Sequence, residues 1–317
     1  MYKFVCVLAF FALVSCKNSS EEKTAEVLVT EIWTENYQTI SLTGDTLRAS
    51  TPSASLQKKY NDKKEAYLAN SKNLDALIWY GRFTAYMGNY REAINIYTSG
   101  LQQFPDNSRL LRHRGHRYIS LREFDKAIED LNKAAKLIQG KENRVEEDGM
   151  PNAQNIPVST MHGNIYYHLG LAYYLNGNFP AALEAYENCL QTSPNPDNVV
   201  SATHWLYMIR RRMNQPEEAE KYLSNISPQM NVIENQSYHK ACLFYKGELP
   251  MDEVYDPISE ATPSNAALKY AIGNWYLYND LPDQARGIFN TMLSGDDWAS
   301  FGYIAAEADM VRVFDQK

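Results

Sequence analysis

Two histidines and several arginines are crowded into one short stretch, and these residue types could bind a ligand. In the segment LLRHRGHR, residues 110–117, His113 and His116 are three positions apart. Arg112 and Arg117 lie in the same segment, and Arg109 comes just before it. On a helix this spacing places both imidazoles on one face, where they could hold a metal ion. The arginines oppose a cation, and no cysteine or carboxylate has ligand spacing nearby. The stretch therefore predicts a site for a carboxylate or phosphate-like anion and no metal site.

Motifs typical of enzymes are absent from the sequence. It contains no GxSxG, P-loop, HExxH or CxxC motif, and no dinucleotide-binding glycine pattern after a strand. Glu146, Glu147 and Asp148 could pair with the histidines if their segment folds inward, but the sequence does not require this. We therefore predict that the protein is not an enzyme and has no cofactor.

A repeating pattern supplies the elements that must position these side chains. Residues 74–107 read LDALIWYGRFTAYMGNYREAINIYTSGLQQFPDN. Gly81 and Ala93 are small, so two helices can approach closely, and Tyr97 fills the space beside them. Gly88 begins a turn that ends the first helix, and Pro105 cannot continue the second. The stretch therefore predicts a helical hairpin.

This pattern resembles the tetratricopeptide repeat, a short helix–turn–helix unit that recurs at a fixed period. A second copy follows directly, with Gly115 in the place of Gly81. The third copy shows the pattern most fully: Tyr166, Leu169, Gly170, Tyr173, Gly177, Phe179, Ala182, Tyr186 and Pro194. A fourth copy begins at about Val200, a fifth is degenerate, and a sixth spans Ile272 to Phe289. A last helix, 298–314, matches only a first-helix half and indicates a cap.

The resemblance implies an all-α fold, a solenoid of five to six helical hairpins with capping helices and a short extended or β-strand N-terminal arm. In such arrays the first helix of each unit lines a concave groove. Carried over position by position, the implied groove residues are Trp79, Arg82, Arg109, Arg112, His113, His116, Tyr167, His168, His204, Trp205, Tyr238, His239, Tyr270 and Asn274. The implied role of the groove is to bind an anionic or extended partner. The alternative is that these are edge residues of a helical stack that share no ligand.

The N-terminus predicts export and lipid attachment. Residues 1–15 contain Lys3 and an apolar run too short for the roughly 20 residues that span a bilayer, which indicates a signal peptide. The run ends in Leu13-Val14-Ser15-Cys16, which resembles the bacterial lipoprotein box and implies that Cys16 is lipidated. An ordinary secretory signal is the alternative. No Asp follows Cys16, which favours the outer over the inner membrane.

The rest of the chain divides into three segments. Residues 16–25 are expected to form a tether, 26–73 an arm and a capping helix, and 74–317 the solenoid. The arm ends in an alternating pattern from Tyr37 to Thr43, followed by Gly44, which could form a small hairpin. Cys189 and Cys242 are expected to be buried thiols, with a disulfide as the alternative.

An insertion separates the second and third copies at about 140–160. The spacing from Gly115 to Gly170 exceeds the spacing from Gly81 to Gly115 by more than half. Long insertions in repeat proteins are often functional loops, but a solvated excursion without a role is the other interpretation.

These patterns together predict a membrane-anchored adaptor or assembly factor of the bacterial envelope that binds a protein or peptide in its groove. A small-molecule or glycan receptor, or a divergent enzyme, with the insertion closing over the His/Arg cluster, is the alternative. The net charge of −7 argues against nucleic acid as a partner.

Overall fold

The computed structural model describes residues 36–315, and its contacts group Gln38–Lys317 into one compact unit. The predicted signal peptide, Cys16, the tether and the first part of the arm lie outside the described residues. Within the described part of the chain, none of the helices combines the length and the apolar character needed to cross a bilayer.

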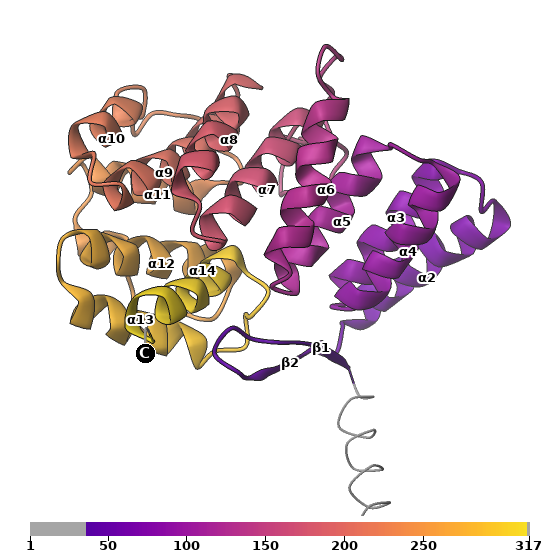
Figure 1. Cartoon of the computed structure of the whole chain (residues 1–317), viewed down its shortest axis with the longest axis horizontal. Helices are drawn as coiled ribbons and strands as arrows, with labels where there is room; N and C mark the ends of the chain where they lie inside the picture. Colours follow the sequence, from indigo (N-terminus) through magenta and orange to yellow (C-terminus); the bar gives the residue numbers. More distant parts are fainter. Residues whose placement is uncertain (1–35, 316–317) are drawn as a thin grey trace, which may run out of the picture. The chain divides into compact units, whose positions relative to one another are not determined.

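Thirteen α-helices make up most of the described chain (Figure 1). They are α2 (Ala54–Ala69), α3 (Leu74–Tyr86), α4 (Tyr90–Gln103), α5 (Ser108–Ser120), α6 (Phe124–Leu137), α7 (Met161–Leu175), α8 (Phe179–Gln191), α9 (Pro196–Arg212), α10 (Pro216–Leu223), α11 (Gln236–Tyr245), α12 (Pro263–Tyr278), α13 (Pro282–Leu293) and α14 (Phe301–Asp309). A π-helical turn, Met310–Phe314, follows α14, and two short strands, β1 (Tyr37–Ile40) and β2 (Thr46–Arg48), precede α2.

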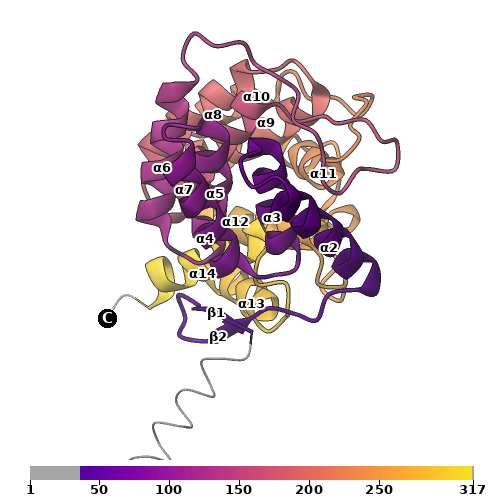
Figure 2. The same cartoon turned by 90° about the vertical axis from the view of Figure 1, so that its right-hand side faces the viewer.

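Consecutive helices form antiparallel hairpins that pack side by side in chain order, as Figures 1 and 2 both show. The pairs are α3/α4, α5/α6, α7/α8, α9/α10 and α12/α13. In the fifth unit only a short 3-10 turn, Met251–Glu253, follows α11 where a second helix would stand. The predicted all-α solenoid of five to six hairpins is confirmed.

Each hairpin turn contains one residue in the left-handed backbone region. Glycine adopts this region freely, whereas other residues pay a steric cost of about 1–2 kcal/mol. The six positions are Gly88, Arg122, Gly177, Asn214, Gly247 and Asp280. Arg122, at φ 65°, stands one full repeat after Gly88, so an arginine occupies the turn position of a glycine in the second unit.

The small and large residues of the repeat pattern meet as the sequence predicts. A β-carbon built on Gly170 would lie 2.6 Å from the ring of Tyr186, and one on Gly115 would lie 2.7 Å from Leu131. Both contacts are shorter than atoms tolerate, so these positions need glycine for the paired helices to approach.

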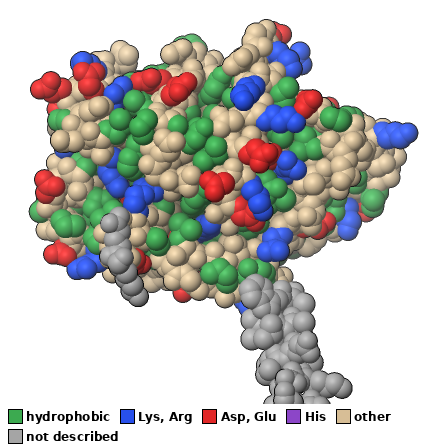
Figure 3. Space-filling view, viewed as in Figure 1, with side chains coloured by type: hydrophobic (Ala, Val, Ile, Leu, Met, Phe, Trp, Pro, Cys, Tyr) green, Lys and Arg blue, Asp and Glu red, His purple; other side chains and the backbone are tan. Residues whose placement is uncertain are grey.

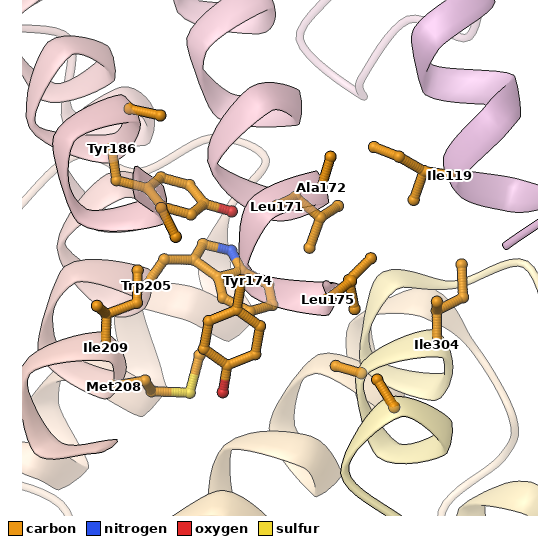
Figure 4. Packing of buried hydrophobic residues seen from close by; sticks show 14 of the residues in the cluster. Ile119, Leu171, Ala172, Tyr174, Leu175, Tyr186, Trp205, Met208, Ile209 and Ile304 are labelled. Carbon is orange, nitrogen blue, oxygen red and sulfur yellow. The ribbon is translucent and has the colours of Figure 1, made fainter. Parts of the chain in front are cut away.

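The hydrophobic core runs between the hairpins. In the part shown in Figure 4, Tyr174 of α7, Tyr186 of α8 and Trp205 of α9 pack together, and Ile304 of α14 lies nearby. All four side chains are at most 1% exposed. Helix α14 therefore belongs to the same core as the central hairpins.

Two buried groups of ion pairs fasten α14. Glu307 is fully buried and accepts hydrogen bonds from Nε and an amino group of Arg122, both at 2.8 Å. Asp309, also fully buried, accepts from Arg212 at 2.8 Å and from Arg312 at 3.0 Å. The last helix is thus bound to the second and fourth units as well as to its neighbours α12 and α13. A simple cap would contact only the last unit.

The end of the N-terminal arm forms the small hairpin, β1 with β2. Thr39 donates to the carbonyl of Leu121 at 3.0 Å, and Trp298 donates to the carbonyl of Arg48 at 2.9 Å. The two described cysteines, Cys189 and Cys242, are buried and free.

Candidate functional site

The two ends of the insertion are hydrogen-bonded to each other; we call this joined part, Val145–Glu146 with Ser159–Thr160, the neck of the insertion. Val145 and Thr160 form an antiparallel bridge, and the backbone N–H of Glu146 donates to the carbonyl of Ser159 at 3.0 Å. The side chain of Thr160 also caps α7 by accepting from the N–H of Gly163 at 3.1 Å. The intervening loop is therefore held at both ends instead of hanging freely.

Glu146 reaches from this neck into the His/Arg cluster. Its carboxylate lies 3.2 Å from Arg112 and 3.3 Å from Nε2 of His113, and it accepts from Asn164 at 2.7 Å. Arg112 also donates to Nδ1 of His113 at 2.7 Å, so His113 carries its proton on Nε2 and donates it to Glu146. The chain thus supplies its own carboxylate to the cluster for which the sequence predicts an anion.

The electrostatics of this cluster favour a neutral imidazole beside an ionised carboxylate. Burial, followed by the charge of Arg112, lowers the pKa of His113 to about 3. Burial alone would raise the pKa of Glu146, but Arg112 and the hydrogen bond from His113 hold it well below its usual range. Glu146 is therefore ionised at neutral pH, and Arg112 supplies its counter-charge.

The loop continues over α3 of the first hairpin. Arg82 donates to the carbonyl of Glu147 at 2.8 Å. A β-carbon on Gly149 would lie 2.7 Å from the hydroxyl of Tyr86 and 3.1 Å from the ring of Trp79, so the loop backbone packs directly on these side chains. The insertion therefore folds inward over α3 and α5.

A cavity of about 630 Å³ lies where α3, α5 and the insertion meet; we call it the N-terminal cavity. The guanidinium of Arg82 lies 4.4 Å from the centre of the Trp79 ring. Arg109 forms an exposed ion pair with Asp75 at 2.6 Å. The lining also includes Lys141, Glu142, Arg144, Glu147 and His162. The cavity thus combines a half-buried aromatic face with charges of both signs.

A second cavity, of about 260 Å³, lies between α5, α7, α9, α11 and α14; we call it the central cavity. His116 and His168 line it with their ring centres 4.2 Å apart. The hydroxyls of Tyr167 and Tyr238 lie 2.9 Å apart. Phe301, at the start of α14, packs against His116 at 5.3 Å and His168 at 5.8 Å. Helix α14 thus closes one side of this cavity.

Five residues predicted to line an open groove belong instead to the interior. His204, Trp205, His239, Tyr270 and Asn274 are each at most 5% exposed. Their contacts are with other parts of the chain's interior, so they do not form an open groove surface. That part of the expectation is wrong.

The cause differs among these five residues. Tyr270 donates to Asp309 of α14 at 2.9 Å, and Asn274 accepts from Arg212 at 2.9 Å. His239 pairs with the carbonyl of Ser227 at 2.8 Å. Helix α14 and the loop after α10 thus occupy the space that an open array would leave free. Sequence reasoning assigned α14 to a cap and gave no site role to Phe301, Glu307 or Asp309.

The other predicted residues fall into three groups. Trp79, Arg82 and Arg109 line the N-terminal cavity, and His116, Tyr167, His168 and Tyr238 line the central cavity. Arg112 and His113 lie beneath Glu146. Among residues 36–315, no group of three or more His, Cys, Asp or Glu side chains is placed to hold a metal ion. The charges on the face shown in Figure 3 are of both signs and interspersed.

Comparisons with known proteins agree with the repeat architecture. Sequence profiles described as the tetratricopeptide repeat match residues 85–142 and residues 163–196. No curated protein matches the chain.

Several solved structures resemble the chain at low identity. A tetratricopeptide repeat protein from Parabacteroides merdae is 20% identical over 79% of this chain and 92% of that one, with a TM-score of 0.46. YrrB, described as a TPR protein with an unusual peptide-binding site, is 14% identical over 77% of this chain and 95% of its own, with a TM-score of 0.42. MamA AMB-1 is 18% identical over 53% of this chain and 85% of its own, with a TM-score of 0.40.

Proposed function

Because the chain is a tetratricopeptide-repeat protein, we propose that it binds a segment of a partner protein in the N-terminal cavity. The observation that carries this proposal is the difference in exposure among the predicted groove residues. Trp79, Arg82 and Arg109 stay partly exposed and gather around one cavity of about 630 Å³, whereas five of the more C-terminal groove positions are buried in the interior. The larger of the two cavities described above thus lies at the first part of the array.

The lining suggests what kind of segment would fit. Trp79 offers a large rigid surface already stacked with a guanidinium, which is typical of an interface anchor. Lys141, Arg144 and Glu142 line the same cavity, and none of their side chains forms an ion pair or a hydrogen bond with another described residue. Unpaired charges of both signs favour an extended segment with acidic and basic residues over a purely acidic one.

The insertion sets the limits of this site. Glu146 neutralises the charge of Arg112 and accepts from the neutral His113, so a partner carboxylate has no free cation to reach there. Displacing Glu146 would leave Arg112 buried and unpaired, which typically costs about 3–5 kcal/mol. The partner therefore binds beside the neck of the insertion and not beneath it.

We further propose that the protein acts as a lipid-anchored adaptor or assembly factor at the bacterial outer membrane. The support is in the sequence: an apolar run after Lys3, followed by Leu13-Val14-Ser15-Cys16. Lipid chains on Cys16 would hold the repeat unit at the membrane surface, since two or more chains anchor stably. The tether of residues 16–25 would leave the cavity free to meet a membrane-associated partner.

The test is an affinity capture from solubilised envelopes of the source organism. The wild-type chain is compared with Trp79→Ala/Arg109→Ala, which alters the cavity, and with Arg286→Ala, which alters an exposed residue of α13. We expect one stoichiometric protein that the wild type and Arg286→Ala retain and the double variant loses. Equal capture by all three chains would refute the cavity as the binding site, and no captured protein would refute the adaptor role.

A further inference from the structure

The central cavity contains polar groups whose hydrogen-bonding capacity is unused. The ring of His116 forms no hydrogen bond with any described residue, and His168 uses only Nδ1, which donates to the carbonyl of Asn164 at 2.5 Å. The free ring nitrogens of both histidines border the same cavity, so a ligand there could satisfy them.

Both histidines are neutral acceptors. Burial lowers the pKa of His116 and of His168 well below the usual range, and the charges of Arg112 and Arg117 add to the effect. Because His168 donates through Nδ1, its Nε2 is the nitrogen that accepts. A ligand that supplies O–H or N–H donors fits these nitrogens.

The charges in and around the cavity do not favour an ionic ligand. Neither lysine nor arginine lines it, so an anion finds no counter-charge. Two carboxylates line it, Asp197 and Glu234, and both accept hydrogen bonds from the chain itself. One oxygen of Asp197 accepts from the N–H of Ile233 at 2.9 Å and the other from the N–H groups of Glu234 and Asn235 at 2.7 and 2.8 Å. The carboxylate of Glu234 accepts from the side chain of Asn152 at 2.6 Å. The neighbouring Arg112 and Arg117 oppose a cation at the histidines. The lining therefore favours an uncharged ligand.

The remaining lining is rich in hydroxyl, amide and aromatic groups. Ser159, Ser201 and Asn164 supply donors and acceptors, while Tyr238 and Phe301 supply ring surfaces. A sugar ring presents hydroxyls around its edge and C–H groups on its faces, which match both parts of this lining. The volume of about 260 Å³ lies just below the usual range for drug-sized ligands, which suits a single ring.

We propose that the central cavity binds an uncharged saccharide unit, with His116 and His168 as acceptors for its hydroxyls. This goes beyond the proposed protein-binding function and uses a separate cavity. The protein would then bind two ligands: a protein segment at α3 and α5, and a sugar between α5, α7 and α11.

Tryptophan indole N–H signals give a readout for each cavity. Trp205 donates its indole N–H to the hydroxyl of Tyr167 at 3.0 Å, and Tyr167 is hydrogen-bonded to Tyr238 in the central cavity wall. Trp79 lines the N-terminal cavity. The other tryptophans of the sequence are Trp33, Trp275 and Trp298. Replacing Trp205 and Trp79 by phenylalanine in turn assigns the two reporter signals.

The experiment is a titration of the full ¹⁵N-labelled chain, in a detergent whose head group contains no sugar. The probes are glucose, galactose, mannose and N-acetylglucosamine, with glucosamine, glucuronate and inorganic phosphate as charged controls. We expect at least one uncharged sugar to shift the Trp205 signal saturably below about 10 mM, while the Trp79 signal stays in place. The result does not depend on whether a protein partner is found.

Two leucine variants complete the test. His116→Leu keeps an apolar side chain against Phe301 and removes the acceptor, so we expect binding to weaken at least about tenfold. His162→Leu, in the N-terminal cavity, should leave binding unchanged. The proposal is overturned if no uncharged sugar moves the Trp205 signal, if only charged probes do, or if His116→Leu binds as the wild type does.

Discussion

Arg122 offers a sharp test of how the C-terminal helix is held. It stands at a turn position where Gly88 and Gly177 serve in the neighbouring units, and its φ of 65° is unfavourable for arginine. A comparison of the repeats alone predicts that Arg122→Gly stabilises the chain. The structure predicts the opposite, because the guanidinium of Arg122 is the counter-charge of the fully buried Glu307.

The expected magnitude follows from three opposing effects. Relief of the left-handed strain should raise the free energy of unfolding by about 1–2 kcal/mol, whereas the greater freedom of glycine in the unfolded chain should lower it by about 0.5–1 kcal/mol. Leaving Glu307 buried without its partner costs about 3–5 kcal/mol. The variant should therefore lose about 2–4 kcal/mol of unfolding free energy, which lowers the thermal midpoint by roughly 5–15 °C.

Circular-dichroism melts of five chains provide the assay: the wild type, Arg122→Gly, Glu307→Gln, the double variant of these two changes, and Asn214→Gly. Asn214→Gly is the matched control, since Asn214 has a φ of 56° in the fourth unit but makes no side-chain ion pair, and it should melt within about 2 °C of the wild type. The double variant Arg122→Gly/Glu307→Gln should cost less than the sum of its two single changes by about 2–3 kcal/mol. An Arg122→Gly chain that melts at or above the wild-type temperature would refute the reasoning.

Three further predictions concern other parts of the chain. Gly170→Leu should destabilise the third hairpin and its neighbours by about 1–3 kcal/mol because its side chain would overlap Tyr186, whereas Gly287→Ala, with open space around the new methyl group, should be neutral or stabilising in the same chemical denaturation. Burial lowers the pKa of His204 to about 3, so below about pH 6.5 the unfolded chain binds a proton that the folded chain does not, and unfolding free energy should fall as pH is lowered from 7 to 4. His204→Gln should make that fall shallower by up to about 1.4 kcal/mol per pH unit, and an unchanged slope would contradict the burial of a neutral His204. Cys16→Ala should move the chain from the membrane fraction to the soluble envelope fraction in a sedimentation assay, and continued sedimentation with membranes would contradict the lipid anchor.

The hairpins could be predicted from the sequence because their rules are local. Glycine at 81, 115 and 170 and the large residues sixteen positions later recur at fixed spacing, and each pair meets in the structure. The degenerate fifth unit was also visible, since too few residues separate α11 from α12 for a full second helix. The helical periodicity and the turn residues thus carry the fold.

The closure of the array could not be predicted in the same way. Arg122 and Glu307 are 185 positions apart, and each alone reads as an ordinary charged residue of a turn or a helix. One signal was available: an arginine where the repeat pattern favours glycine implies that its side chain makes a stabilising interaction. The pairing of Glu146 with Arg112 and His113 was weighed from sequence but not required by it, because three acidic neighbours were equally able to make it.

Photocrosslinking in cells tests the central claim, that a partner protein binds at the N-terminal cavity, most directly. A photoreactive phenylalanine derivative is placed in turn at Trp79, at Arg109 and, as the control, at Arg286 of α13. The account predicts that the first two positions give the same discrete adduct with one envelope protein and that the third does not. Adducts of equal yield from all three positions, or none from Trp79 and Arg109, would contradict it.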